Sequence, residues 1–199
     1  MPEARLRKAA PADRPALVEV LARAFDDDPF LDWFCRKDAR RGEAIARFMR
    51  VGLQIITGVH DETYTTDELA GAAAWVPPGR WRLGLLRRLR LVPDMVRAAS
   101  LPRAPAAFAA IGKIGTHHPA PPHWYLFLLG VDPARQGQGV GGQLLRPVLD
   151  RCDRERTGAY LETAAPRNLA FYQRHGFRVA DELHVGGAPP LWLMWRDPQ

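Results

Sequence analysis

The sequence predicts a mixed α/β (α+β) fold in which a sheet is flanked by helices. Three observations predict it: an apolar strand at 124–131 leads through a glycine-rich loop into a helix, two short strand patterns lie at 64–66 and 70–76, and a hairpin pattern ends the chain. A chain of 199 residues can bury about 70% of the surface that it exposes when unfolded. We therefore expect a single domain, 1–199, with a helical insertion at about 77–122.

The N-terminal part of the chain predicts one edge strand followed by helices. Residues 3–9 alternate in polarity, as an edge strand does, and Asp13 can cap the first helix. Asp28 followed by Pro29 is typical of a helix N-terminus. Residues 40–58 then repeat apolar side chains at helical spacing, so a longer amphipathic helix is expected before the first pair of strands.

The predicted insertion carries two helical patterns. Residues 81–99 form a basic amphipathic pattern that Pro93 interrupts, and 104–114 form a second one. Such a basic helix can bind a membrane surface or a partner's groove, but more commonly it packs on its own domain, which we expect here. The adjacent His117 and His118 could serve as a base or as metal ligands, although the prolines around them favour a surface loop.

The glycine-rich loop is the most informative stretch. Four of the six residues from Gly137 to Gly142 are glycines, and apolar side chains at helical spacing follow from Gln143. Glycines permit a tight turn, and a helix N-terminus presents unpaired N–H groups and a positive dipole end. The pattern predicts a binding site for a phosphate or a pyrophosphate.

Two other phosphate-binding motifs fit less well. A P-loop would end in Gly-Lys-Ser/Thr, whereas this loop ends in Gly-Gly-Gln and lacks both the lysine and the hydroxyl. The dinucleotide fingerprint is matched by Gly137, Gly139 and Gly142, and Glu162 is the one candidate for its acidic residue. A match on glycines alone is weak, so the dinucleotide interpretation ranks second.

A resemblance narrows the choice. Gln136-x-x-Gly139-x-Gly141, preceded by Leu-Gly-Val-Asp-Pro at 129–133, resembles the acetyl-CoA pyrophosphate loop of the GCN5-related N-acetyltransferase (GNAT) family. Residues 160–177 are similar to that family's next element, and within the family they most resemble the puromycin N-acetyltransferases. The likeness is closest between 124 and 177. It implies the GNAT fold, with a central mixed, mostly antiparallel sheet of about six to seven strands flanked by helices.

The resemblance also implies an activity. We expect an acetyl-CoA-dependent N-acetyltransferase that transfers acetyl directly to an amine of a small molecule, such as puromycin or another antibiotic or metabolite, which would make it an antibiotic-resistance or self-protection enzyme. One alternative is acetylation of a protein N-terminus or lysine. The other is a non-catalytic sensor that binds acyl-CoA. The helices of the insertion are expected to cover the acceptor site.

The resemblance assigns most of the cofactor contacts to backbone. The backbone of Leu129 and Val131 is expected to bind pantetheine and to polarise the thioester carbonyl. Asn168 is expected to hydrogen-bond CoA, and it can also cap the helix that follows. The CoA pyrophosphate is expected at Gln136, Gly137, Gln138, Gly139, Val140, Gly141 and Gly142, with Arg135 or Gln136 assisting.

Two residues are expected to move protons. Tyr172 is the candidate general acid for the CoA thiolate, and its alternative role is a packed core aromatic. Glu162 is the first candidate for the general base, ahead of Asp26, Asp27 and His123. A base is dispensable for an amine near pKa 8, of which about a tenth is neutral at pH 7, whereas deprotonating a lysine-like amine costs about 4.6 kcal/mol. The absence of an obvious histidine base favours a weakly basic acceptor.

The segment between the first two helices is expected to line the acceptor pocket. In this hypothesis Asp26 or Asp27 attracts a cationic amine, while Phe30, Trp33 and Phe34 form an apolar wall. The alternative is that the aspartates form a capped, solvated turn favoured by the helix dipole.

Charge and cysteine content limit which other partners and cofactors are expected. The net charge is +6, but the arginines are scattered and form no aromatic-interleaved ribbon, so we expect no nucleic acid. Cys35 and Cys152 have no metal-ligand spacing, which favours reduced thiols in a cytoplasmic protein and no metal. No apolar run reaches the length of a membrane span, so no membrane is expected. The sequence leaves monomer and homodimer open.

Overall fold

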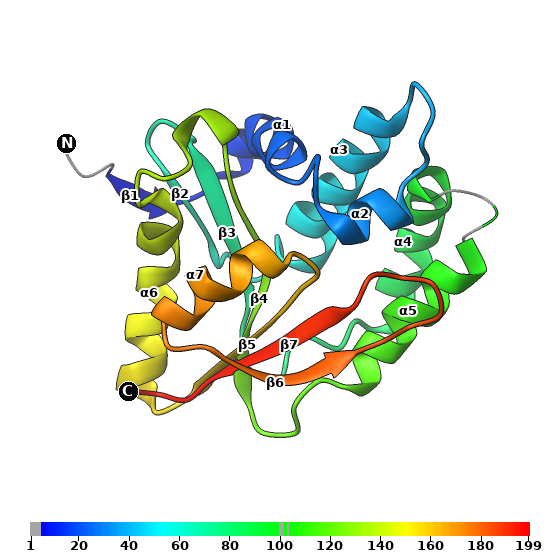
Figure 1. The fold of residues 1–199 in the computed structure, drawn as a ribbon. Helices are drawn as coiled ribbons and strands as arrows, with labels where there is room; N and C mark the ends of the chain where they lie inside the picture. The colour runs from blue at the N-terminus through cyan, green and yellow to red at the C-terminus, as the bar shows by residue number, and fades with distance from the viewer. Residues whose placement is uncertain (1–4, 100–101, 103) are drawn as a thin grey trace.

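The computed structural model describes residues 5–99, 102 and 104–199. They form one sheet with helices packed on both faces (Figure 1). Its strand order is β1-β2-β3-β4-β5-β7-β6, and each neighbouring pair is antiparallel except β4 and β5. The expected mixed α/β class and mostly antiparallel sheet are confirmed. The strands are β1 (Leu6–Lys8), β2 (Thr63–Thr66), β3 (Gly71–Val76), β4 (His123–Val131), β5 (Gly158–Thr163), β6 (Arg178–Leu183) and β7 (Leu191–Arg196).

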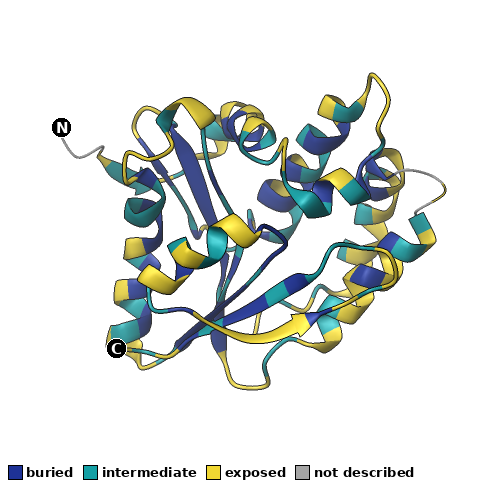
Figure 2. Ribbon diagram, viewed as in Figure 1, coloured by how far each residue is buried: buried dark blue, intermediate teal, exposed yellow. Residues whose placement is uncertain are grey.

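The helices divide between the two faces of the sheet. We call the side that packs against α6 and α7 the α6 face, and the side that packs against α1 and α3 the α3 face. Figure 2 shows β3 and β5 almost entirely buried, β4 with buried and intermediate residues, and most of β6 exposed at the edge of the sheet. The helices are α1 (Arg14–Ala24), α2 (Pro29–Phe34), α3 (Arg41–Val51), α4 (Leu85–Ala98), α5 (Ala104–Thr116), α6 (Val140–Glu155) and α7 (Leu169–Arg174).

Most predicted boundaries agree with the structure, with two differences. The expected edge strand at 3–9 is β1, which is shorter, and Glu3 and Ala4 lie outside the described residues. The expected interruption at Pro93 is wrong, because α4 continues through it. Pro93 removes a donor from the carbonyl of Leu89, but Leu89 is 59% exposed, so water can satisfy that carbonyl.

A one-residue bulge in β4 determines where the sheet opens. Trp75 of β3 pairs with Leu126 and Ala74 pairs with Leu128, so Phe127 is the extra residue. The bulge inverts the alternation of side chains: Leu126 lies on the α6 face, but Leu128 lies on the α3 face. The pairing of β4 with β5 ends at the same point, with Leu126 opposite Leu161. Beyond it, β4 is paired with β3 alone.

The end of α3 fits against this bulge. The pattern predicted at 40–58 forms α3 and then a π-helical turn, η2 (Gly52–Ile56). A Cβ on Gly52 would lie 2.8 Å from Leu128 Cδ1 and 2.9 Å from Phe127 Cε1. Glycine at this position therefore lets the helix approach the irregular part of β4.

Candidate active site

The glycine-rich loop forms the N-terminus of α6, as expected. Gly139 is the N-cap residue with φ +81°, and Gly137 has φ +74°, a region that favours glycine. The first helical hydrogen bond runs from Gln143 N to Gly139 O at 3.2 Å. The N–H groups of the residues before Gln143 therefore have no helical acceptor, and the helix dipole adds positive potential there. This geometry suits a pyrophosphate.

The other two glycines of the loop allow α7 to pack on the first turn of α6. A Cβ on Gly141 would lie 3.2 Å from Phe171 Cζ, and one on Gly142 would lie 2.8 Å from His175 Nε2. Close packing places the start of α7 beside the loop. Asn168 precedes α7, but its side chain makes no capping hydrogen bond, so its amide remains available for a ligand.

The loop is braced by the side chains that were expected to help bind phosphate. Gln136 Nε2 donates to Val131 O at 3.1 Å, and Gln138 Nε2 donates to Ala134 O at 3.2 Å. Arg135 is paired with Glu68. These contacts occupy the three side chains and leave the backbone N–H groups at the start of α6 available to a ligand.

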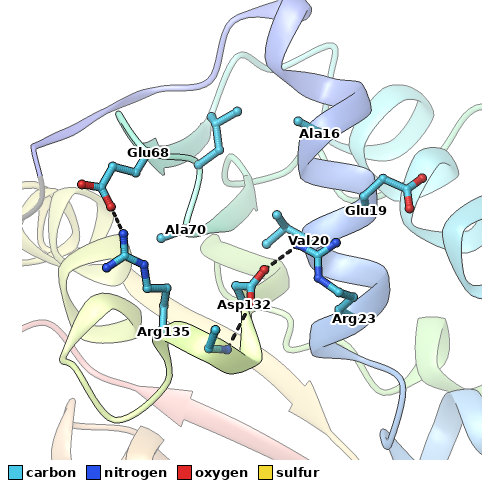
Figure 3. A pocket seen from close by; sticks show the side chains of 10 residues that line it. Ala16, Glu19, Val20, Arg23, Glu68, Ala70, Asp132 and Arg135 are labelled. Atoms are coloured by element: carbon cyan, nitrogen blue, oxygen red, sulfur yellow. Dashed lines mark hydrogen bonds and ion pairs between the residues drawn. The ribbon is translucent and has the colours of Figure 1, made fainter.

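A surface cavity of about 510 Å³ lies beside the loop, between α1 and the turn η4 (Pro133–Arg135). Figure 3 shows Arg135 directed toward Glu68 and Arg23 directed toward Asp132 at 2.5 Å along its wall. None of the loop glycines lines it. The cavity is therefore separate from the glycines at the start of α6, and the pair of Arg23 with Asp132 fixes the start of the loop to α1.

The gap between β4 and β5 exposes backbone groups of β4. Asp132 donates its N–H to Ala70 O, on the β3 side, at 2.8 Å. Because backbone groups of successive residues in a strand point to opposite sides, those of Val131 and Leu129 point away from β3, into the gap. Val131 O accepts the bond from Gln136, and the N–H groups of both residues can bind a ligand.

Tyr172 lies on the α6 face and is 7% exposed. Its ring makes edge contacts with Phe171 (5.2 Å between centroids) and Phe177 (5.9 Å). Burial raises the pKa of the Tyr172 hydroxyl, and the charge of Asp28 raises it further. Tyr172 therefore keeps its proton at neutral pH and can donate it to a leaving group.

Glu162 lies in β5 on the opposite, α3 face, beside Tyr125 and Tyr160. Its side chain is 10% exposed. Burial raises its pKa to about 7, although the hydroxyls of Tyr125 and Tyr160 favour the charged form. Within the described chain, neither Glu162 Oε1 nor the Tyr160 hydroxyl has a hydrogen-bond partner. A carboxyl of this pKa is suited to accept a proton near pH 7.

His118 lies in a loop, as expected, but its side chain is covered. Its side chain is 3% exposed and lies 3.4 Å from Glu162, measured from Nε2 to Oε1. Trp81 stacks on the His118 ring at 4.0 Å with an interplanar angle of 11°. His117 is exposed, as expected. The prolines after the histidines do form a loop, but Trp81 covers the second imidazole.

A model of the GNAT acetyltransferase family matches residues 57–177. The chain belongs to this family. It is 25% identical over 205 residues to an uncharacterized N-acetyltransferase, C550.08, of Schizosaccharomyces pombe, a match that spans 94% of this chain and 81% of the relative. The prediction of the family and of acyltransferase activity is thereby confirmed.

The names of similar solved structures mention both protein acceptors and small amine acceptors. One is a Corynebacterium glutamicum protein described as histone acetyltransferase HPA2 and related acetyltransferase, with 25% identity, a TM-score of 0.73 and coverage of 98% of this chain and 97% of that one. Another is arylalkylamine N-acetyltransferase 2 from Aedes aegypti, with 13% identity, a TM-score of 0.63 and coverage of 99% and 100%. The second likeness is one of fold alone.

In this acetyltransferase, the aspartates expected in the acceptor pocket are paired with arginines. Asp26 pairs with Arg41 at 2.6 Å, and Asp27 pairs with Arg167 at 2.5 Å. Both carboxylates are exposed. The more buried residue is Asp28, which caps α2 by accepting from two backbone N–H groups at 3.0 Å. Burial raises the pKa of Asp28, and its charge acts on Tyr172.

Among the aromatic residues of α2, Phe30 contacts the cores of both halves of the sheet. Phe30 packs against the core under α3 and also against the cluster on the α3 face of β5, β6 and β7. Its ring lies 5.8 Å from that of Trp33 and 6.0 Å from that of Phe34. Ile114 of α5 joins the second cluster. The α3 face beside β5 is therefore bordered by α2 and by the end of α5.

The described residues contain no group of three or more His, Cys, Asp or Glu side chains arranged to hold a metal ion. Cys35 and Cys152 are buried thiols outside any disulfide, and burial raises the pKa of each to about 12. No helix in the described part of the acetyltransferase has both the length and the apolar character that crossing a membrane requires.

Proposed function

We propose that this chain transfers acetyl directly from acetyl-CoA to the amine of a small molecule. The observation that carries the proposal is the gap between β4 and β5. A proton donor, Tyr172, lies on one face of the sheet there, and a proton acceptor, Glu162, lies on the other. The N-terminus of α6, which suits an anion, follows β4 through the turn η4 and the glycine-rich loop.

The backbone supports acetyl-CoA as the donor. The first-turn N–H groups of α6, from Val140 to Gly142, fit its pyrophosphate. The N–H groups of Leu129 and Val131 fit pantetheine and the thioester oxygen, and the Asn168 amide supplies a further donor. Loss of one donor to the oxyanion of such a reaction costs about 3 kcal/mol in turnover.

In the proposed reaction the amine nitrogen attacks the carbonyl carbon of the thioester. Glu162 accepts the proton that the amine loses, the C–S bond breaks, and Tyr172 donates its proton to the departing thiolate. The pKa of about 7 leaves Glu162 about half ionised at pH 7, whereas the raised pKa of Tyr172 keeps it protonated. Both groups are thus in the required state near neutral pH.

The surroundings of the gap favour a small acceptor. Phe30 contacts both halves of the sheet, and Lys113 of α5 donates to His184 O at 3.1 Å in the segment between β6 and β7. These contacts narrow the space that an extended peptide would need. Asp26 and Asp27 are paired with Arg41 and Arg167, so they add no net negative charge for a cationic amine. Puromycin is the first acceptor to test, because of the resemblance of residues 160–177.

Thiol release from acetyl-CoA, measured with puromycin, aminoglycosides, polyamines, amino acids and histone-tail peptides, tests the proposal. Release with one or more of the small amines supports it, and puromycin alone would indicate a resistance enzyme. Release with peptides and with no small amine would overturn the small-molecule acceptor. Binding of acetyl-CoA without acetyl transfer to any amine would overturn the proposed reaction.

A further inference from the structure

A chain of buried polar groups leads from Glu162 to a backbone carbonyl in the loop before β4. His118 Nε2 lies 3.4 Å from Glu162 Oε1, and His118 Nδ1 lies 3.3 Å from His123 Nε2. His123 Nδ1 lies 2.7 Å from Pro121 O. The His118 side chain is 3% exposed and His123 is 2% exposed, so water does not compete for these contacts.

The carbonyl of Pro121, at the far end of this series of polar contacts, determines which ring nitrogens carry a proton. A carbonyl can only accept, so His123 Nδ1 carries a proton and donates it to Pro121 O. Burial lowers the pKa of both histidines, to about 3 for His118, so both rings are neutral at pH 7. His123 Nε2 is then an acceptor, and His118 Nδ1 must donate to it. The remaining nitrogen, His118 Nε2, therefore presents a lone pair to Glu162.

When protonated, Glu162 can supply the hydrogen-bond donor that the lone pair of His118 Nε2 lacks. Its Oε1 is buried and has no hydrogen-bond partner in the described part of the chain. Two lone pairs at this distance repel each other, and one proton between them removes the repulsion. We infer that Glu162 and His118 act as one proton-accepting pair for the acceptor amine. The ionised Glu162 carboxylate takes the proton, and the carboxyl then shares it with His118 Nε2 in a hydrogen bond. His118 is the positioning residue.

The inference rests on the proposed function and completes its proton balance. As the N–C bond to the acetyl group forms, the amine N–H bond breaks and its proton moves to the Glu162 carboxylate. The resulting carboxyl donates its hydrogen bond to His118 Nε2. Tyr172 protonates the thiolate as the C–S bond breaks, so one proton leaves the amine and one reaches CoA. The proton on the pair is later lost to solvent, and Tyr172 regains one.

The surroundings hold the pair in place. The His118 ring is stacked on Trp81 and makes an edge contact with Tyr125 at 4.7 Å. Tyr160 lies 4.8 Å from the same ring, between centroids. The other charges that act on these groups are Arg82, which lowers the pKa of His118, and Asp181, which raises that of Tyr160.

The test compares the same substitution at two adjacent histidines. His118→Phe keeps a flat ring for Trp81 but removes Nε2, and His117→Phe changes an exposed ring that contacts Lys113 O. We expect His118→Phe to lower kcat about 10- to 100-fold with little change in KM for acetyl-CoA. The rising limb of the pH profile should move to lower pH, because protonated Glu162 loses its acceptor. His117→Phe should match the wild type, and a folded His118→Phe enzyme that matches it too would overturn the inference.

A second readout needs no activity. Nitrogen-15 NMR of histidine-labelled protein at pH 7 should show His118 and His123 as neutral rings protonated at Nδ1. A proton at Nε2 of either ring would overturn the inference. If His118→Phe does not fold, His123→Phe removes the acceptor of His118 and should shift the pH limb in the same direction. Failure of the wild type to acetylate any amine would refute the proposed function without altering the NMR result.

Discussion

Replacement of Tyr172 by phenylalanine removes one oxygen atom from the site and leaves the packing almost unchanged. The ring keeps its edge contacts with Phe171 and Phe177 on the α6 face. The hydroxyl lies in the field of Asp28 and keeps its proton because burial raises its pKa. The variant therefore tests whether that proton is used.

The expected loss follows from this geometry. General acid catalysis contributes about 10²- to 10⁴-fold, or about 3–5 kcal/mol in activation free energy. Because the CoA pyrophosphate would contact the backbone of α6 and not Tyr172, the affinity for acetyl-CoA should change less than about threefold, or under 1 kcal/mol. The free energy of unfolding should also change by less than about 1 kcal/mol, since the aromatic contacts remain.

The assay measures kcat by thiol release, and the affinity for acetyl-CoA by calorimetry. Tyr64→Phe is the matched control, because the Tyr64 hydroxyl donates to Glu62 Oε2 at 2.8 Å in β2, away from the gap. It should lose about 1 kcal/mol of stability and keep its turnover. Equal losses of turnover and of CoA affinity in Tyr172→Phe would refute its role as the acid, and so would an unchanged kcat.

Three further outcomes are expected from the same structure. Gly139→Ala, at φ +81°, should cost about 1–2 kcal/mol of stability and weaken acetyl-CoA binding. Gly112→Ala is its control in α5, where a Cβ would meet open space, and it should stabilise the fold by about 0.5–1 kcal/mol. Denaturant unfolding measures the two stabilities, and calorimetry measures acetyl-CoA binding. Asp153→Ala should cost about 3–5 kcal/mol, because Arg196 is 4% exposed and pairs with Asp153 at 2.7 Å. Arg196 lowers the pKa of Asp153, so this stabilisation is present above the unfolded pKa of about 3.9 and is lost as the pH falls through the lower folded pKa. Urea unfolding should therefore show a smaller difference in the free energy of unfolding between variant and wild type at pH 3 than at pH 7. With an acceptor amine whose own pKa is well below 6, kcat/KM should rise with pH and reach half its plateau near pH 7, and Glu162→Gln should remove that limb; a limb that persists in the variant would exclude Glu162 as the base.

The parts of the site that the sequence predicted are those set by local chemistry. Gly137 and Gly139 adopt positive φ, and such positions favour glycine wherever they occur, so the loop can be recognised in the sequence. The cap at Asp28 was equally local, because it binds N–H groups two and three residues away. What the cap did not reveal was that the same carboxylate lies close enough to Tyr172 to raise its pKa.

The parts that the sequence did not predict depend on contacts between distant segments. The side chain of His118 is buried because Trp81, far from it along the chain, stacks on its ring. The side-chain amides of Gln136 and Gln138 donate to the backbone carbonyls of Val131 and Ala134, which the residue types alone do not indicate. Neither outcome follows from residue type, because an exposed and a buried histidine in a proline-rich loop have the same local pattern.

The bulge at Phe127 has the largest consequence of these long-range features. Because side chains alternate along a strand, one extra residue in β4 changes the face on which every later side chain lies. The bulge coincides with the last pair between β4 and β5, so the backbone of Leu129 and Val131 is freed where Tyr172 and Glu162 can approach from opposite faces. In the proposed reaction, the position of the bulge therefore determines whether Tyr172, Glu162 and the backbone donors of β4 can act on one thioester.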